Sequence, residues 1–96
     1  MIHIAGTVRV REVAAAEEAI RALVAASRAE DGCIEYSLCF DLLDPNLVWI
    51  NERWETMEAL GAHSKTEHYK AWGAKAAGLG ISDSSIRLYT EEPKDL

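Results

Sequence analysis

Two segments of alternating side chains, separated by a turn signal, constrain the fold of this chain more than any other feature. In residues 33–40 the larger side chains occupy every second position: Ile34, Tyr36, Leu38 and Phe40 alternate with Cys33, Glu35, Ser37 and Cys39. Such a period of two is typical of a β-strand, whose successive side chains point to opposite faces of a sheet. Asp44-Pro45-Asn46 is a turn signal, because proline presets its own backbone angle. We therefore predict that residues 33–40 and 47–54 pair as a hairpin, with the larger side chains of the first strand under the helices.

The second strand of this hairpin has no plainly polar face. Its two faces read Val48, Ile50, Glu52 and Trp54 on one side, and Leu47, Trp49, Asn51 and Arg53 on the other. A sheet with one side turned to water shows polar residues there, so Leu47 and Trp49 indicate that the second face is also covered. A partner subunit is the simplest cover, and we expect a homodimer.

The remaining periodicities place this hairpin in a larger α+β unit. Residues 2–11 alternate as a strand, and residues 13–29 carry one apolar stripe on strong helix formers, ended at Gly32. Thr56 is a plausible N-cap for a short helix to His63, and Ser64 has the capping-box spacing to Glu67 for a helix to about residue 77. Ile86, Leu88 and Tyr89 belong to a last strand. The order predicts a ferredoxin-like βαββαβ fold with an antiparallel sheet.

Size and composition limit the possible classes of protein. Ninety-six residues make one domain, 1–96, because a chain of this length has no surface left for a second core. Ten basic against sixteen acidic residues give a net charge of −6, which argues against nucleic acid as a partner. There is no apolar run near the roughly 20 residues that cross a bilayer, and the N-terminus does not resemble a signal sequence. We expect a cytoplasmic protein without a membrane partner.

The two cysteines predict neither a disulfide nor a metal site. Cys33 and Cys39 lie six residues apart in one predicted strand and on the same face of it, where strand geometry holds them beyond disulfide reach. A closed structural zinc site needs four well-spaced ligands, and two cysteines with scattered histidines do not supply them. We therefore expect buried thiols and no metal.

Four segments together resemble the small antibiotic biosynthesis monooxygenase family. They are EDGCIEYSL, DPN, NERWE and EALGAHSKTEHYKAW, in this order along the chain. The resemblance implies a dimeric α+β barrel, in which two sheets face each other and each subunit has a pocket between sheet and helices. The family includes cofactor-free quinol monooxygenases and an isomerase of a phosphorylated signalling sugar. Haem-degrading relatives carry an Asn, a Trp and a His where this chain has Thr7, His63 and residues 73–75, so neither haem nor another cofactor is expected.

His63 and Glu52 are the candidate catalytic residues. The resemblance places His63 on the helix after the third strand, facing the pocket, where a neutral imidazole can take a proton from a phenol or an enol near pH 7. The alternative is a helix-terminal histidine bonding the last carbonyls. Glu52 is predicted to face the helices, where burial raises a carboxyl pKa and lets the group shuttle a proton. Its alternative role is an ion pair with a nearby Arg or Lys.

Five further side chains are candidates for substrate binding: Tyr36, Trp54, His68, Tyr69 and Trp72. His68 and Trp72 are four apart and share a helix face, with Tyr69 beside Trp72. Tyr36 faces the helices and can donate a hydrogen bond to a substrate oxygen. The alternative is that the aromatic residues belong to the core and that His68 lies at its rim.

Three functions remain open from the sequence. The leading hypothesis is a cofactor-independent monooxygenase that oxidises a small aromatic or quinol-like substrate with molecular oxygen, with His63 as the base. The second is an isomerase of a small phosphorylated sugar, whose phosphate requires a cation such as Lys70 or Lys75. The third is a non-catalytic dimer that binds a small apolar ligand.

Overall fold

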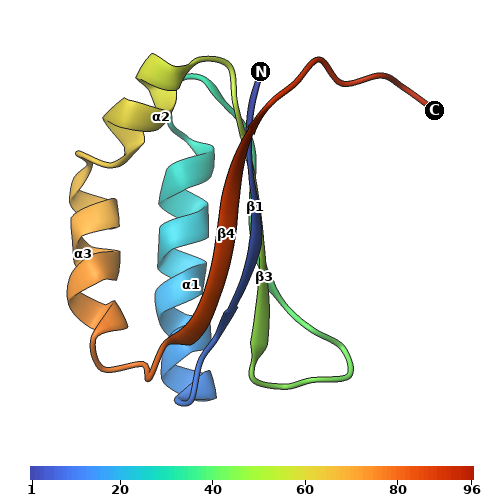
Figure 1. Ribbon diagram of the computed structural model, residues 1–96. Coiled ribbons are helices and arrows are strands. Elements are labelled where there is room, and N and C mark those ends of the chain that lie inside the picture. Colours follow the sequence, from blue (N-terminus) through green and yellow to red (C-terminus); the bar gives the residue numbers. More distant parts are fainter.

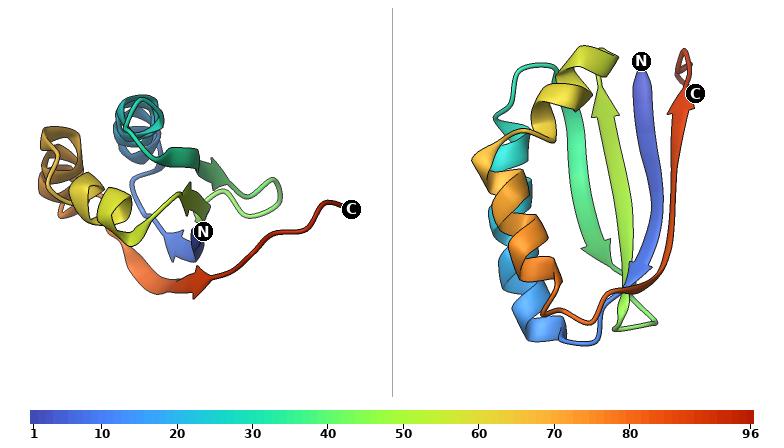
Figure 2. Two further views of the ribbon diagram at one scale, coloured as in Figure 1. Left: turned by 90° about the horizontal axis from the view of Figure 1, so that it is seen from above. Right: turned by 60° about the vertical axis from the view of Figure 1, so that its left-hand side comes forward.

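The computed structural model describes all residues, 1–96, and confirms the predicted ferredoxin-like α+β fold (Figure 1). The elements in chain order are β1 (Ile2–Arg9), α1 (Val13–Arg28), β2 (Cys33–Phe40), β3 (Leu47–Trp54), α2 (Met57–His63), α3 (Glu67–Ala76) and β4 (Ser82–Thr90). The four strands form one antiparallel sheet in the order β2-β3-β1-β4. All three helices cover the same face of this sheet (Figure 2), so the other face has no helix on it.

The core lies between α1 and the inner face of the sheet, as the two periodicities predict. Val8 and Val48 pair across β1 and β3 and are almost wholly buried. From α1, Ala16 and Ile20 pack in the same cluster, and Leu23, on the same helix face at the three- and four-residue spacing, packs in a second cluster with Tyr36 and Trp54. The sheet and α1 therefore form the packed core, and the positions of α2 and α3 determine the size of the space beside it.

A β-bulge at the start of β2 corrects the prediction for the cysteines. Cys33 pairs with Trp54, but Glu35 pairs with Arg53, so Ile34 is an extra residue in the ladder. The bulge reverses the alternation: Cys33 packs beneath the helices, and Ile34 is 44% exposed. Cys39, after the bulge, is exposed. The prediction that both cysteines share a face, buried, was therefore wrong, although both are free thiols.

The helix ends agree with the sequence at one cap and differ at another. Thr56 caps α2 as predicted, its hydroxyl accepting a hydrogen bond from the Ala59 amide at 3.1 Å. For α3, the cap is Thr66 and not Ser64: the Thr66 hydroxyl accepts from the Tyr69 amide and donates to the His63 carbonyl at 2.8 Å. Ser64 instead ends α2, because the turn after His63 uses three residues before α3 can begin. Thr66 thus ties the end of α2 to the start of α3.

The outer face of the sheet carries exposed aromatic side chains beside polar ones. Trp49, on β3, is 52% exposed, and Tyr89, on β4, is 44% exposed. Asn51 lies on this outer face as predicted, between His3 and Glu35, and bonds to both at 2.8 and 2.9 Å. None of the helices has the length and apolar character needed to cross a membrane.

Candidate active site

A largely apolar cavity of about 500 Å³ lies between the inner face of the sheet and the helices. Fifteen of its twenty lining residues are hydrophobic, and they include no lysine and no arginine. Five of the seven predicted site residues line it: Tyr36, Glu52, His63, Tyr69 and Trp72. Such a space accepts a small ring-shaped molecule and excludes most of its water.

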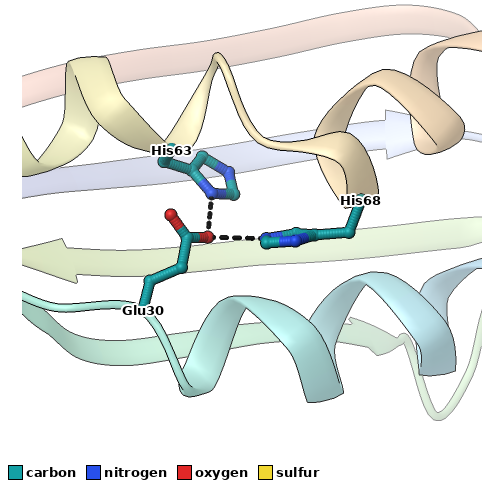
Figure 3. A group of neighbouring side chains, drawn as sticks. All are labelled: Glu30, His63 and His68. Atoms are coloured by element: carbon teal, nitrogen blue, oxygen red, sulfur yellow. Dashed lines mark hydrogen bonds and ion pairs between the residues drawn. The ribbon is translucent and has the colours of Figure 1, made fainter.

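His63 is the titratable side chain most deeply enclosed at this cavity. It is the last residue of α2, is 2% exposed, and lies on the cavity wall. Its Nδ1 lies 2.6 Å from the Glu30 carboxylate (Figure 3). Its Nε2 lies 3.4 Å from the Tyr36 hydroxyl. The ring therefore bonds to side chains and not to the last carbonyls of its helix. A carboxylate on Nδ1 leaves Nε2 as the nitrogen on the cavity side, which is the arrangement of an oriented general base.

Three aromatic rings enclose the His63 imidazole. The ring centroids of Trp54, Tyr69 and Tyr36 lie 4.8, 4.9 and 5.2 Å from that of His63. Trp54 is wholly buried and does not line the cavity, so it packs against the histidine from behind and does not reach a molecule in the cavity. This packing fixes the orientation of the imidazole.

Glu30 joins the two histidines of the site. One of its oxygens, Oε2, lies 2.6 Å from His63 Nδ1 and 2.8 Å from His68 Nε2, as Figure 3 shows. The side chain of Glu30 is 12% exposed and that of His68 is 25% exposed. His68 does not line the cavity; it lies on the far side of the carboxylate, so the structure places it beside the base and not beside a substrate.

Glu52 forms a polar point on the otherwise apolar wall of the cavity. Burial raises the pKa of its carboxyl, and the hydrogen bond from Trp54 and the positive charge that His63 can carry oppose that shift. The Trp54 indole donates to Glu52 Oε1 at 3.0 Å, so the partner of this carboxylate is the indole and not an arginine or lysine. The prediction that Glu52 faces the helices is confirmed.

Tyr36 remains a neutral phenol at this site. Burial, followed by the negative charge of Glu52, raises the pKa of its hydroxyl well above the ordinary value. A neutral hydroxyl close to His63 can donate a hydrogen bond to the imidazole or to an oxygen of a bound molecule.

Glu30 is the site residue that the sequence did not predict. It lies in the link between α1 and β2, thirty-three positions before His63. No periodicity marks it, because it belongs to no regular element. Two signals were available: its position directly before Asp31-Gly32, where the chain turns out of α1 toward the sheet, and its place as the first residue of the EDGCIEYSL segment.

Comparisons with known proteins agree with this architecture. The model of the family described as antibiotic biosynthesis monooxygenase matches residues 1–75. A solved structure from Deinococcus radiodurans, described by the same family name, is 23% identical, with 100% of this chain and 97% of that chain covered and a TM-score of 0.90. The protein PA3566 from Pseudomonas aeruginosa is 31% identical, with coverages of 96% and 94% and a TM-score of 0.86. A comparison with curated proteins found no match.

Proposed function

This chain belongs to the antibiotic biosynthesis monooxygenase family, and on that premise we propose that it oxidises a small aromatic, quinol-like substrate with molecular oxygen. The observation that carries the proposal is the buried His63, which a carboxylate holds on one nitrogen while its ring faces an apolar cavity. An aromatic ring system with one ionisable hydroxyl matches both the apolar cavity and His63: the rings pack against the apolar walls, and the imidazole accepts the hydroxyl proton.

The first step is deprotonation of the substrate. His63 Nε2 accepts the phenolic proton, and the Glu30 carboxylate stabilises the imidazolium that forms. The proton moves from the substrate hydroxyl to His63, which leaves a substrate anion beside the ion pair of Glu30 and the imidazolium. The aromatic side chains Tyr69 and Trp72 wall the cavity and keep water from the anion.

The second step is oxidation by oxygen, with all electrons supplied by the substrate. The anion transfers one electron to dioxygen, and the resulting substrate radical and superoxide combine to form a carbon–oxygen bond. The peroxide then takes up a proton and loses water: its O–O bond breaks as the hydrogen on the same ring carbon leaves as a proton. In sum, a phenol with one hydrogen on the oxidised ring carbon and O₂ give a quinone and H₂O, a balance that requires no external reductant. Glu52, whose pKa burial raises, is the carboxyl on the cavity wall that can protonate the departing oxygen.

The cavity does not favour the isomerase alternative. A sugar phosphate needs a cation at its phosphate, and neither Lys70 nor Lys75 lines the cavity. Lys70 instead lies 3.5 Å from Glu67 on the exposed side of α3. A non-catalytic ligand-binding role requires no base, and it does not account for a buried histidine held by a carboxylate.

Oxygen uptake tests the proposal. The purified protein, without added metal or flavin, is expected to consume oxygen with a panel of anthrone-type and naphthol-type substrates. His63→Ala, with its folding checked by circular dichroism, is expected to lose this activity, while His3→Ala on the outer face keeps it. Turnover that survives His63→Ala, or product that forms equally well without oxygen, would overturn the proposal. Tight ligand binding without turnover would favour the non-catalytic role, in which the protein only binds a small apolar ligand.

We also propose that two copies associate through the outer faces of their sheets. The support is the pair of exposed aromatic side chains, Trp49 and Tyr89, on a sheet face that no helix covers. Light scattering is expected to give the mass of a dimer for the wild-type protein and of a monomer for Trp49→Glu. A wild-type monomer would remove the dimer from the proposal.

A further inference from the structure

We propose that Glu30, His63 and His68 form a binding site for one divalent transition-metal ion such as Zn²⁺, and that the ion blocks the proposed base. One ligand atom from each residue lies within 4.8 Å of the other two. Two imidazole nitrogens and a carboxylate oxygen are a donor set that suits Zn²⁺, Co²⁺ and Ni²⁺. Three protein ligands leave at least one position of the ion open to water.

The three side chains converge from three separate segments. Glu30 lies after the end of α1, His63 ends α2, and His68 is the second residue of α3 (Figure 3). The Thr66 cap joins the two histidine-bearing helices, so the site is already assembled by the fold. An ion there would connect these segments at one point and would stabilise the folded chain.

The charge of the cluster favours a cation. The only ion-pair partners of the Glu30 carboxylate are the two histidines, and neither carries a permanent charge. Exposure rises along the cluster, from 3% for the His63 side chain to 12% for Glu30 and 25% for His68. The Glu30 carboxylate has little water around it and therefore attracts a cation. The partly exposed His68 side chain marks the end of the cluster from which a cation can enter.

Binding requires a local rearrangement of the three ligand atoms. The present distances of 2.6 and 2.8 Å from Glu30 Oε2 are those of two N–H donors on one oxygen. Ligands at about 2.1 Å from a tetrahedral ion lie roughly 3.4 Å from one another, so the carboxylate must withdraw by somewhat more than half an ångström. The two imidazole nitrogens, which lie within 4.8 Å of each other, must reach the same spacing. Each neutral imidazole then turns a lone pair toward the ion and keeps its proton on the other nitrogen. For His63 that nitrogen is Nε2, with the Tyr36 hydroxyl 3.4 Å away as its outer-shell partner.

The inhibitory part of this inference rests on the proposed function. With the ion on Nδ1, His63 Nε2 carries a hydrogen and has no lone pair for a substrate proton. Binding of the ion therefore competes directly with general-base action. The binding part does not depend on turnover and can be measured alone.

Calorimetric titration of the tag-free, chelator-treated protein with ZnCl₂ tests the site. We expect one Zn²⁺ per chain, with the affinity reduced at least tenfold in Glu30→Gln and in His68→Ala and unchanged in His3→Ala. His68→Ala is the decisive variant, because this side chain is partly exposed and its loss is not expected to unfold the chain. In Co²⁺-loaded protein, visible absorption bands of low-coordinate cobalt are expected and should disappear in the same two variants.

Two results would overturn the site: no stoichiometric binding, or binding that a folded His68→Ala variant keeps at wild-type strength. If quinol turnover is found, Zn²⁺ should abolish it in the wild-type protein and affect His68→Ala at least tenfold less; equal inhibition of both would overturn the blocking role. Absence of any turnover contradicts the proposed function alone, because the calorimetric result stands without it.

Discussion

The hydrogen bond between Trp54 and Glu52 gives a quantitative test of the cavity wall. Trp54 is wholly buried, and its indole donates to the Glu52 carboxylate at 3.0 Å. A hydrogen bond to a charged group contributes about 1.5–3 kcal/mol, and a bond between neutral groups contributes about 1 kcal/mol. Replacing an indole by a phenyl ring costs roughly a further 1 kcal/mol in burial and packing. We expect Trp54→Phe to lower the free energy of unfolding by about 3 kcal/mol at pH 8.

A double-mutant cycle isolates the contribution of the carboxylate charge. In a Glu52→Gln background the indole still donates to a neutral amide, so Trp54→Phe should cost only about 2 kcal/mol. Urea unfolding followed by far-ultraviolet circular dichroism, at one fixed protein concentration, measures all four free energies. The expected coupling of about 1 kcal/mol exceeds the error of 0.3–0.5 kcal/mol that is usual for independent sites.

Trp49 provides a matched control for this cycle. Its indole also donates to a carboxylate, that of Asp41 at 2.9 Å, but the side chain is 52% exposed. Trp49→Phe should show no coupling to Glu52→Gln, because the carboxylate that accepts from the Trp49 indole is that of Asp41. Equal costs of Trp54→Phe in the two backgrounds would refute the reasoning, because Glu52 would then not be the buried partner that the structure shows.

Three further predictions concern the cavity, the helix junction and the dependence on pH. Gly61 lines the cavity and Gly73 does not, and an added Cβ meets nothing within 4 Å at either helix position. Each Gly→Ala change should raise the free energy of unfolding by about 0.5–1 kcal/mol. Gly61→Phe should weaken binding of an aromatic ligand in a fluorescence titration, whereas Gly73→Phe should not. Thr66→Ala removes both an N-cap and a bond to the end of α2 and should cost about 1–2 kcal/mol in urea, with Thr66→Ser within about 0.5 kcal/mol of wild type. Burial raises the Glu52 pKa above its unfolded value of 4.5, so the folded state binds the Glu52 carboxyl proton more tightly than the unfolded state does. The contribution of this proton to the free energy of unfolding is full below pH 4.5 and is lost as the pH rises through the raised pKa. Glu52→Gln should consequently gain stability relative to wild type between pH 4.5 and pH 8, and a constant difference would contradict the buried placement.

The periodicities of the sequence predicted the elements because they are local. Alternation in residues 2–11 and 47–54 marked the strands, of which the first ends at Arg9, and a three- to four-residue spacing marked α1. The side chains of β3 face as their parity predicts, which placed Glu52 toward the helices and Asn51 away from them. The Ser64 cap was wrong because Ser64 and Thr66, two residues apart at the junction, offer similar local signals, and only the packing of α3 selects between them.

The sequence by itself therefore determined the order of strands and helices, the two faces of β3 and the presence of His63 at the end of a helix. The tertiary structure alone decided that Ile34 bulges out and turns Cys33 inward, because a bulge depends on the register between two strands. It also decided that Glu30 meets His63 and His68, since three segments must first pack on one sheet before a carboxylate thirty-three residues away can reach an imidazole. Contacts of that range follow from packing and not from spacing along the chain.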